Sequence, residues 1–498
     1  MSGEGAGTGT AARRAELRLG LSLALGGLVI VLDTTITVVA VPELIRVFDA
    51  PLATVQWTTT AYLLALVATM PLGGWLTARV GARRTYVVAL LGFAAASAWA
   101  GLAHGIGELI AARVAQGLAG GLINPIGFGL ALRDVPPGRR GRMTALLGLP
   151  VLVGPLLGPV AAGWLIDAWS WRAIFFVTVP PALLGAALVH RWAERDPAPQ
   201  RAPLDVAGLL LLVPGAVAVV YGLGAADAST PMRAVAVIAG ATLGTAFAAR
   251  AIHHPAPLLR IRLLADPVFA GAAALLTLFA AGYFGSMLLM PAYVQITRDD
   301  PAVVAGSLMI PAALATGLSL QVATRLVDRV SPRLIVGTGL TIVLAGVGLT
   351  LLVLRTDTSY VVLGALVAFT GVGAGAVIMP TMTAAARHLN GADLASGSAI
   401  LTLISQLANA AGTAGVTALY AGMIGWRSAA ADLEEVSGLP AAARLDLAPD
   451  LVTAQRLTQL ATLVLFGGAL VIALRYLGRG PAVAASREPA PATEEVAP

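Results

Sequence analysis

The sequence contains no cysteine, which excludes disulfide bonds, thiolate metal sites and catalysis by a thiol. It also contains no lysine, because all 32 Lys and Arg residues are arginine. A phosphate-binding P-loop requires a lysine. The chain therefore has no Walker-type ATPase of its own, and energy for any uphill process must come from a gradient or from another chain.

Charged residues are scarce as well, at 12% of the 498 residues, whereas 57% are hydrophobic. So little polar surface cannot cover a water-soluble body of this size, so we expect a multi-pass protein of the cytoplasmic membrane. Aromatic residues make up only 5%, and abundant Gly and Ala favour close packing of membrane helices through small residues. The net charge of +6 comes from arginines in the turns, which membrane topology explains without any nucleic acid.

Apolar stretches of roughly 20 residues, the length that spans a bilayer, recur along the chain. Most arginines lie in turns that face the cytoplasm if both termini are inside, as the positive-inside rule requires. We predict an all-α integral membrane protein with fourteen spans, at about 19–41, 55–78, 85–103, 106–132, 143–166, 173–193, 205–225, 233–252, 268–292, 302–324, 333–354, 358–382, 395–424 and 456–478.

The spans form groups of six, two and six, and the two in the middle are separated from the others by proline-rich linkers. An internal repeat, Leu76–Arg83 after the second span and Leu326–Arg333 after the tenth, indicates two related halves, as in secondary transporters. The acidic external loop is expected to form a short surface helix. The predicted regions are a cytoplasmic tail (1–18), a six-helix bundle (19–193), linkers with two extra helices (194–267), a second six-helix bundle (268–478) with an external loop at about 425–455, and a disordered cytoplasmic tail (479–498).

Two charged residues, Asp33 and Arg113, lie inside predicted spans and away from their ends. Asp33 is about 15 residues into the first span, where a charge costs at least ~2.5 kcal/mol on insertion scales. A carboxyl there can take a proton from one side and release it to the other, or it can be a structural group bonded to Thr34 or Thr37. Arg113, in the fourth span, can pair with Asp33, brace a neighbouring backbone, or extend its long side chain toward the interface.

The fifth span carries two Gly-Pro pairs four residues apart, Gly154-Pro155 and Gly158-Pro159. The glycines give a flat strip for close helix contact. The prolines remove backbone donors and favour a bend. Ordinary membrane packing explains a single Gly-xxx-Gly, but the doubled Gly-Pro pattern is more specific.

The chain resembles the fourteen-span drug:proton antiporters of the major facilitator superfamily. The resemblance covers nearly the whole chain and rests on LDTTITVVAVP, QWTTTAYLLALVATMPLGGWL, RVAQGLAGG and GPLLGPVAAGWLIDAWSWRAIFFVTVP. It implies two six-helix bundles facing a central cavity, with two inserted helices. The Gly-Pro helix resembles the motif that distinguishes exporters from symporters, and it includes Gly148, Gly154, Pro155, Gly158 and Pro159.

The resemblance also implies roles for single residues. Asp33 would be the proton-coupling carboxylate, with Arg113 as its partner. The turns that latch one conformation would comprise Leu76, Arg79, Gly81, Arg83, Arg84, Asp328 and Arg329. The chain departs from the family at Ala78, where an aspartate is usual, and at Ser405, where relatives often have an arginine.

The expected function is proton-coupled export of small apolar or cationic compounds by a monomer, with the proton as coupling ion and no other cofactor or metal. The rival interpretations are a proton-coupled nutrient symporter, a non-transporting sensor or scaffold, and a membrane enzyme, for which the sequence shows no catalytic set. The candidates to line the substrate cavity are Tyr62, Asn124, Tyr283, Met287, Tyr293, Gln295, Gln406 and Asn409.

Overall fold

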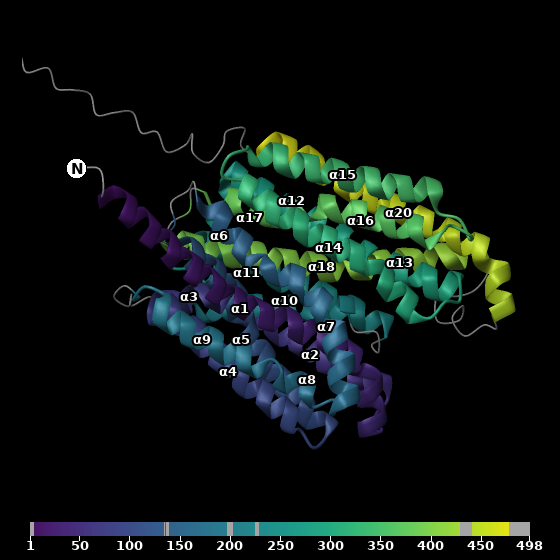
Figure 1. Ribbon diagram of the computed structural model, residues 1–498, viewed down its shortest axis with the longest axis horizontal. Coiled ribbons are helices and arrows are strands. Elements are labelled where there is room, and N and C mark those ends of the chain that lie inside the picture. The colour runs from purple at the N-terminus through teal and green to yellow at the C-terminus, as the bar shows by residue number, and fades with distance from the viewer. Residues whose placement is uncertain are drawn as a thin grey trace, which may run out of the picture.

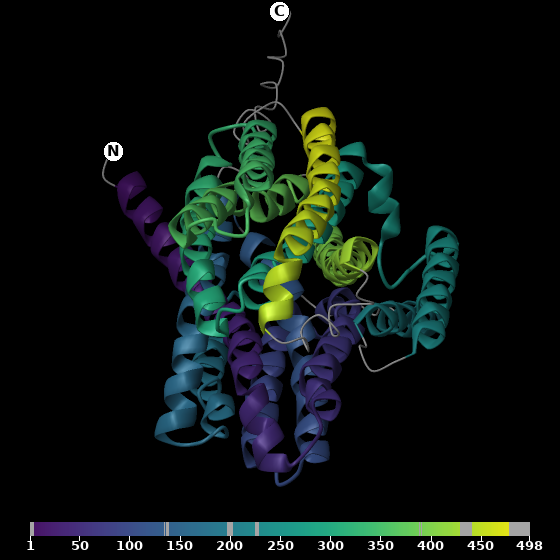
Figure 2. The same cartoon turned by 90° about the vertical axis from the view of Figure 1, so that its right-hand side faces the viewer.

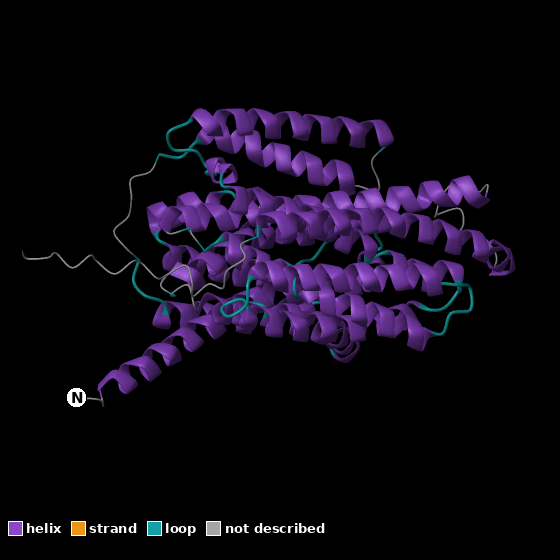
Figure 3. Ribbon diagram, turned by 90° about the horizontal axis from the view of Figure 1, so that it is seen from above, coloured by secondary structure: helices purple, strands orange, loops and turns teal. Residues whose placement is uncertain are grey.

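The computed structural model describes residues 4–133, 135, 139–196, 203–224, 229–387, 389, 391–428 and 441–477. Within these ranges the chain is helical and contains no strand, so the predicted all-α class is confirmed (Figure 3). The helices run roughly parallel to one another along the longest axis of the molecule (Figure 1).

The first half of the chain packs into one bundle, in which α2 and α4 lie against α5 and α1 lies against α7. Its helices are α1 (Glu4–Phe48), α2 (Leu52–Thr69), α3 (Leu72–Val80), α4 (Ala82–Leu102), α5 (Ile106–Arg133), α6 (Arg140–Leu147), α7 (Leu149–Ala168), α8 (Ala173–Phe176) and α9 (Val179–Trp192).

A second bundle follows, in which α14 packs on α16 and α12 packs on α18 and α20. It comprises η2 (Ile261–Ala265), α12 (Pro267–Ser286), α13 (Leu289–Ala292), the π-helix η3 (Tyr293–Thr297), α14 (Ala302–Leu326), α15 (Pro332–Val353), α16 (Tyr360–Gly375), α17 (Ile378–Ala385), α18 (Gly391–Ser428) and α20 (Ala441–Tyr476).

Between the bundles in sequence, α10 (Val206–Gly224) and α11 (Thr230–His253) form a hairpin. The hairpin stands at one side of the molecule (Figure 2), and α10 contacts α2 of the first bundle and α18 of the second. The described chain thus has the expected order of a bundle, two extra helices and a second bundle.

Among the described residues, twelve helices are long and apolar enough to span a membrane, or thirteen if α2 and α3, which are bent by 55° at their junction, form one span. The span expected at about 143–166 falls on α6 and α7, which are not among these thirteen. The structure therefore supports a multi-pass helical membrane protein, and fourteen spans stay a prediction.

Two segments expected outside the spans are helical and continue neighbouring helices. Residues 4–18 continue α1, because their alanines, glutamates and arginines are good helix formers. In the external loop, residues 441–455 belong to α20 and so do not form a separate surface helix. Residues 429–440 and the tail expected at 479–498 lie outside the described residues.

Small residues set the closest helix contacts, as expected for a chain with few aromatics. A Cβ atom at Gly117 of α5 would lie 2.3 Å from the carbonyl oxygen of Tyr62 in α2. A Cβ atom at Gly412 of α18 would lie 2.1 Å from the carbonyl oxygen of Ala281 in α12. These crossings permit backbone contact that any larger residue would prevent.

One end of the molecule carries three arginine-bearing turns, at Arg79–Arg84, Arg139–Arg142 and Arg325–Arg333, and we call it the arginine-rich face. The first residues of α1 and the last of α20 lie at this same end (Figure 1). Contacts between the two bundles join α6 to α14 and α17, α7 to α14, and α5 to α18.

Candidate functional site

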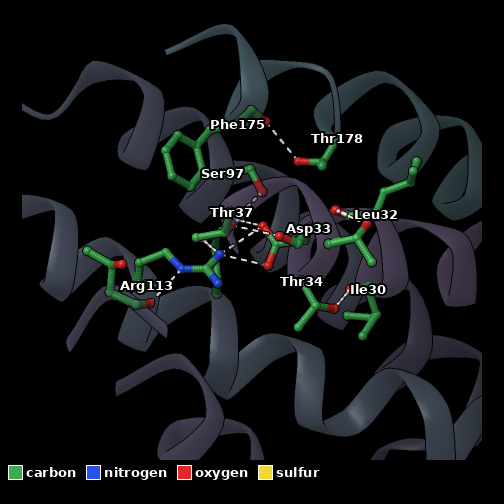
Figure 4. Close-up of polar contacts among 12 residues, drawn as sticks. Ile30, Leu32, Asp33, Thr34, Thr37, Ser97, Arg113, Phe175 and Thr178 are labelled. Carbon is green, nitrogen blue, oxygen red and sulfur yellow. Dashed lines mark hydrogen bonds and ion pairs between the residues drawn. The ribbon is translucent and has the colours of Figure 1, made fainter. Parts of the chain in front are cut away.

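Asp33 and Arg113 form a buried ion pair between α1 and α5 (Figure 4). The NH1 atom of Arg113 lies 2.8 and 2.7 Å from the two carboxylate oxygens of Asp33. The Nε atom donates to the carbonyl oxygen of Thr58 at 2.9 Å, which fixes the guanidinium on α2. Gln116, one turn after Arg113, places its Nε2 atom 3.2 Å from Asp33 and 2.7 Å from the hydroxyl of Ser97.

The pair is cut off from solvent, since Asp33 is 2% exposed and Arg113 0%. The Tyr62 ring covers the guanidinium, with its centroid 4.2 Å from Cζ. Among the described residues, NH2 of Arg113 has no hydrogen-bond partner, so this ring is its nearest electrostatic contact. Of the interpretations left open, the structure shows pairing with Asp33 and a bond to a neighbouring backbone.

This arrangement favours an ionised carboxylate, because a buried charge is tolerated only when it is paired and hydrogen-bonded. Protonating Asp33 would remove the counter-charge of the Arg113 guanidinium, which would keep only its bonds to the Thr58 carbonyl oxygen and the Gln116 side-chain oxygen. Proton uptake thus requires that Arg113 gain another partner or water. A buried pair of this kind can link protonation to movement of α1 against α5.

A cavity of about 460 Å³ lies between the two bundles. It contains four of the eight expected lining residues, Tyr62, Asn124, Gln406 and Asn409. The other lining residues are mostly apolar, and they come from α1, α2, α4, α5, α6, α7, α12, α17 and α18.

The other four expected lining residues lie outside this cavity. Tyr283 stacks on Phe279 with ring centroids 5.4 Å apart, and Tyr293 is fully buried with its hydroxyl donating to the carbonyl oxygen of Arg355. Met287 is 48% exposed, and Gln295 is exposed. Tyr283 lies within α12 and is not among the cavity-lining residues of that helix, which are Leu276, Ala280 and Phe284. For the other three residues, the breaks between α12, α13 and the π-helix η3 change the helical phase.

The glycines of α7 hold it against α1 at the depth of Asp33. A Cβ atom at Gly154 would lie 2.1 Å from Val31, and one at Gly158 would lie 2.1 Å from the hydroxyl oxygen of Thr35. Val31 and Thr35 flank Asp33 by two residues on either side. Directly before α7, a Cβ atom at Gly148 would lie 2.8 Å from the side chain of Leu320 in α14 of the second bundle. The bend expected at Pro155 and Pro159 depends on side chains that lie outside the described residues.

In the first arginine-bearing turn, an acidic residue that the sequence analysis missed makes the key contacts. Asp196, after α9, accepts hydrogen bonds from the backbone N–H groups of Arg83 and Arg84 at 2.9 and 3.1 Å. It also lies 3.6 Å from Arg133. Gly81, with φ of 103°, begins α4 in a conformation that favours glycine. Only the polar linker composition marked this region, because Asp196 is more than 100 residues from its partners.

The remaining residues expected in these turns are peripheral to the contact with Asp196. Leu76 provides a carbonyl oxygen 3.4 Å from the Thr85 hydroxyl, and the guanidinium of Arg79 lies 5.7 Å from the Trp75 ring. The side chain of Arg329, in the turn at Arg325–Arg333, is exposed.

In the arginine-bearing turn at Arg325–Arg333, Asp328 joins the two bundles. Its carboxylate accepts hydrogen bonds from the N–H groups of Gly141 and Arg142, at 2.9 and 3.2 Å, at the start of α6. Arg140 donates in return to the carbonyl oxygens of Ala386 and Arg387, at 2.7 and 3.1 Å. Burial raises the pKa of Asp328, although the two N–H groups oppose that shift. These contacts join the two bundles at the arginine-rich face.

The corresponding position in the first turn, Ala78, makes no such contact. It lines a second cavity of about 510 Å³ together with Arg260, Asp393 and Ser396. Arg260, in the linker before α12, donates from its backbone to the Ser396 hydroxyl at 2.8 Å and pairs with Asp393 at 2.6 Å. The start of α18 is thus held by the linker that follows the inserted helices, a contact that sequence repeats alone did not indicate.

Among the described residues, no group of three or more His, Cys, Asp or Glu side chains is placed to hold a metal ion. The described groups at the centre of the molecule are the Asp33–Arg113 ion pair and the uncharged side chains that line the cavity beside it.

Comparison with known proteins places the chain in a family. Residues 23–413 match the family described as the Major Facilitator Superfamily. The chain is 34% identical over 388 residues to "Multidrug resistance protein B homolog" of Mycobacterium tuberculosis, covering 77% of this chain and 72% of that protein. It is 33% identical over 411 residues to "Puromycin resistance protein pur8" of Streptomyces alboniger, covering 79% and 81%.

The fold agrees with this placement. The structure of the proton:xylose symporter XylE matches 90% of this chain and 95% of its own, with a TM-score of 0.58 at 16% identity, which shows the fold alone. The relatives are membrane transporters and not enzymes, and they imply a small-molecule substrate. The chain is a multi-pass membrane transporter that belongs to the major facilitator superfamily.

Proposed function

We propose that this transporter exports small, mostly apolar molecules from the cytoplasm in exchange for protons, by alternating access of the cavity between its two bundles. The observation that carries the proposal is the buried Asp33–Arg113 pair, because Asp33 lies about one helix turn after Ile30 and directly before Thr34, which both line the cavity. Burying a charge pair in a membrane protein is costly, so such a pair is expected at a position where protonation drives a step of transport.

Coupling follows from what the pair needs in each state. With the arginine-rich face closed, the Asp33 carboxylate is bound by Arg113. Protonation releases Arg113, which stays bonded to Thr58 and Gln116 while α1 is free to shift. An inward proton supplies about 2.3 kcal/mol per 100 mV of membrane potential, plus the pH difference.

The proposal includes a topology of fourteen crossings in the cytoplasmic membrane. The ends of the described chain lie at one end of the molecule, which requires an even number of crossings, and α7 is long and apolar enough to be the fifth. Placing the arginine-rich face in the cytoplasm satisfies the positive-inside rule. The chain then has both termini inside, and it acts as a monomer.

Two further features support export. The α7 helix packs on α1 in one bundle and on α14 in the other, so it can seal the boundary between them as the substrate moves. Two relatives carry names that refer to resistance to several drugs and to puromycin. Both are consistent with outward transport of drug-like compounds.

The test uses purified protein in proteoliposomes with a pH-sensitive dye inside and a panel of drugs, puromycin included, added as substrates. Wild-type protein is expected to move protons when a substrate gradient is applied, and Asp33→Asn is expected to abolish this movement while the protein stays folded. Glu43→Gln is the matched control, because Glu43 is a carboxylate on the same helix, paired with Arg46 outside the apolar span Arg14–Thr37.

Proton movement in Asp33→Asn equal to that of the wild type would refute the coupling role of Asp33. Accumulation of substrate on the side from which protons leave supports antiport. Accumulation on the side that protons enter would identify a symporter instead.

A further inference from the structure

The central cavity contains polar groups but no charge. None of its described lining residues is Asp, Glu, Arg or His, and the sequence has no lysine. A cation buried there would lose its hydration without gaining a counter-charge, which is strongly unfavourable.

The nearest carboxylate does not fill this role. The residues of α1 that line the cavity, Gly27, Ile30, Val31 and Thr34, share one face of the helix, whereas Asp33 does not line it. Both oxygens of Asp33 are already bound by Arg113. A cationic ligand would have to break that pair before it gained any attraction.

The polar groups of the cavity differ in how far they are already used. The hydroxyl of Ser405 donates to the carbonyl oxygen of Leu401, and that of Thr402 donates to Ser398, both at 2.8 Å. Tyr86 donates its hydroxyl to the carbonyl oxygen of Leu23 at 3.0 Å. The hydroxyl of Tyr62 is buried and has no hydrogen-bond partner among the described residues, so it is a donor that a ligand can satisfy.

The same tyrosine contacts the ion pair. Its ring lies 4.2 Å from the Arg113 guanidinium, while the residue also lines the cavity. A ligand that binds the Tyr62 hydroxyl therefore acts on the residue that packs directly on the partner of Asp33.

We propose that the cavity binds uncharged amphipathic molecules that present a hydrogen-bond acceptor, and that Tyr62 is the residue that selects them and joins their binding to the Asp33–Arg113 pair. This rests on the proposed function and narrows its substrate class. Amides at Asn124, Gln406 and Asn409 add further neutral donors and acceptors to the same cavity.

The experiment compares two tritium-labelled probes that differ in one methyl group and one charge: a dimethylaminocoumarin, which is neutral and has a carbonyl acceptor, and its quaternary trimethylammonium counterpart. Equilibrium dialysis against the full-length protein in nanodiscs gives each Kd, with empty nanodiscs as background. The neutral probe is expected to bind at least ~10-fold more tightly. Equal binding, tighter binding of the cation, or no saturable binding of the neutral probe overturns the assignment.

The role of Tyr62 is tested by Tyr62→Phe, which removes only the hydroxyl. It is expected to weaken binding of the neutral probe by about 5–10-fold, the effect of one lost neutral hydrogen bond. Tyr86→Phe, whose hydroxyl is already bonded within the protein, is expected to have a smaller effect. An unchanged Kd in Tyr62→Phe overturns the assignment of this residue.

Transport by Tyr62→Phe gives a second readout. The variant is expected to raise KM for the neutral probe and to keep kcat within about 2-fold of the wild type, because the ring on Arg113 stays in place. A loss confined to kcat contradicts ligand selection by the hydroxyl. Both Kd measurements are independent of proton flux. If Asp33→Asn moves protons as the wild type does, the antiport proposal fails, and the Kd values still decide this proposal separately.

Discussion

A double-mutant cycle on Asp33 and Arg113 tests the energetic basis of the site. Arg113→Met leaves a buried carboxylate whose one remaining side-chain donor is Gln116, so the free energy of unfolding is expected to fall by about 3–5 kcal/mol. Asp33→Asn is expected to cost less, about 1–3 kcal/mol, because Arg113 keeps the Thr58 carbonyl, the Gln116 oxygen and the Tyr62 ring.

The double variant replaces the ion pair by neutral groups and is expected to be nearly as stable as the wild type, as with other buried pairs. The coupling energy then amounts to about 3 kcal/mol or more. Neutral interhelical hydrogen bonds in membrane proteins average only about 0.6 kcal/mol, so the measurement separates a true ion pair from an ordinary polar contact.

The assay is reversible unfolding in mixed detergent and SDS micelles, followed by tryptophan fluorescence. The same cycle on Glu43 and Arg46, an exposed pair on α1, serves as the control and should give a coupling indistinguishable from zero. Additive losses in the Asp33–Arg113 double variant would refute the reasoning, because they would mean that the two charges are stabilised independently.

Two further predictions concern the contacts around this site. Gly158→Val is expected to slow transport and to lower stability by about 1–3 kcal/mol, because its Cβ would meet Thr35 at 2.1 Å, whereas Gly163→Val, with no atom within 4 Å of its Cβ, should have little effect on either quantity. Asp328→Asn is expected to raise severalfold the rate at which a cysteine at Thr383, placed in this cysteine-free chain, is labelled by a maleimide, and an unchanged rate would show that Asp328 does not hold the face closed.

The sequence was informative wherever one helix was enough to make the argument. Apolar length predicted the spans, and the cost of a charge in an apolar helix identified Asp33 and Arg113. The four-residue spacing of Gly154 and Gly158 predicted a flat strip, and both glycines do lie in close contact with α1. Each inference needed only the local helical period.

Contacts between distant segments could not be derived in this way. Asp196 bonds to residues more than 100 positions away, and Arg140 bonds to carbonyl oxygens on the far side of the bundle interface. In the sequence, Asp196 and Arg140 cannot be distinguished from the other acidic and basic residues of polar turns. Met287, Tyr293 and Gln295 lie outside the cavity for a different reason, since breaks in the helix after Ser286 altered which face meets the centre.

The asymmetry between the two turns bears on the energy of the transport cycle. Opening the arginine-rich face requires loss of two N–H bonds to Asp328 and two bonds from Arg140, while Ala78 contributes no polar bond of this kind. Hydrogen bonds to charged groups contribute about 1.5–3 kcal/mol each, and hydration of the separated groups returns part of this. An inward proton supplies about 2.3 kcal/mol per 100 mV and 1.36 kcal/mol per unit of pH difference. Before hydration is counted, the four bonds of this latch amount to about 6–12 kcal/mol, which exceeds the energy of a single proton, and equal latches in both turns would double the energy that each cycle must overcome.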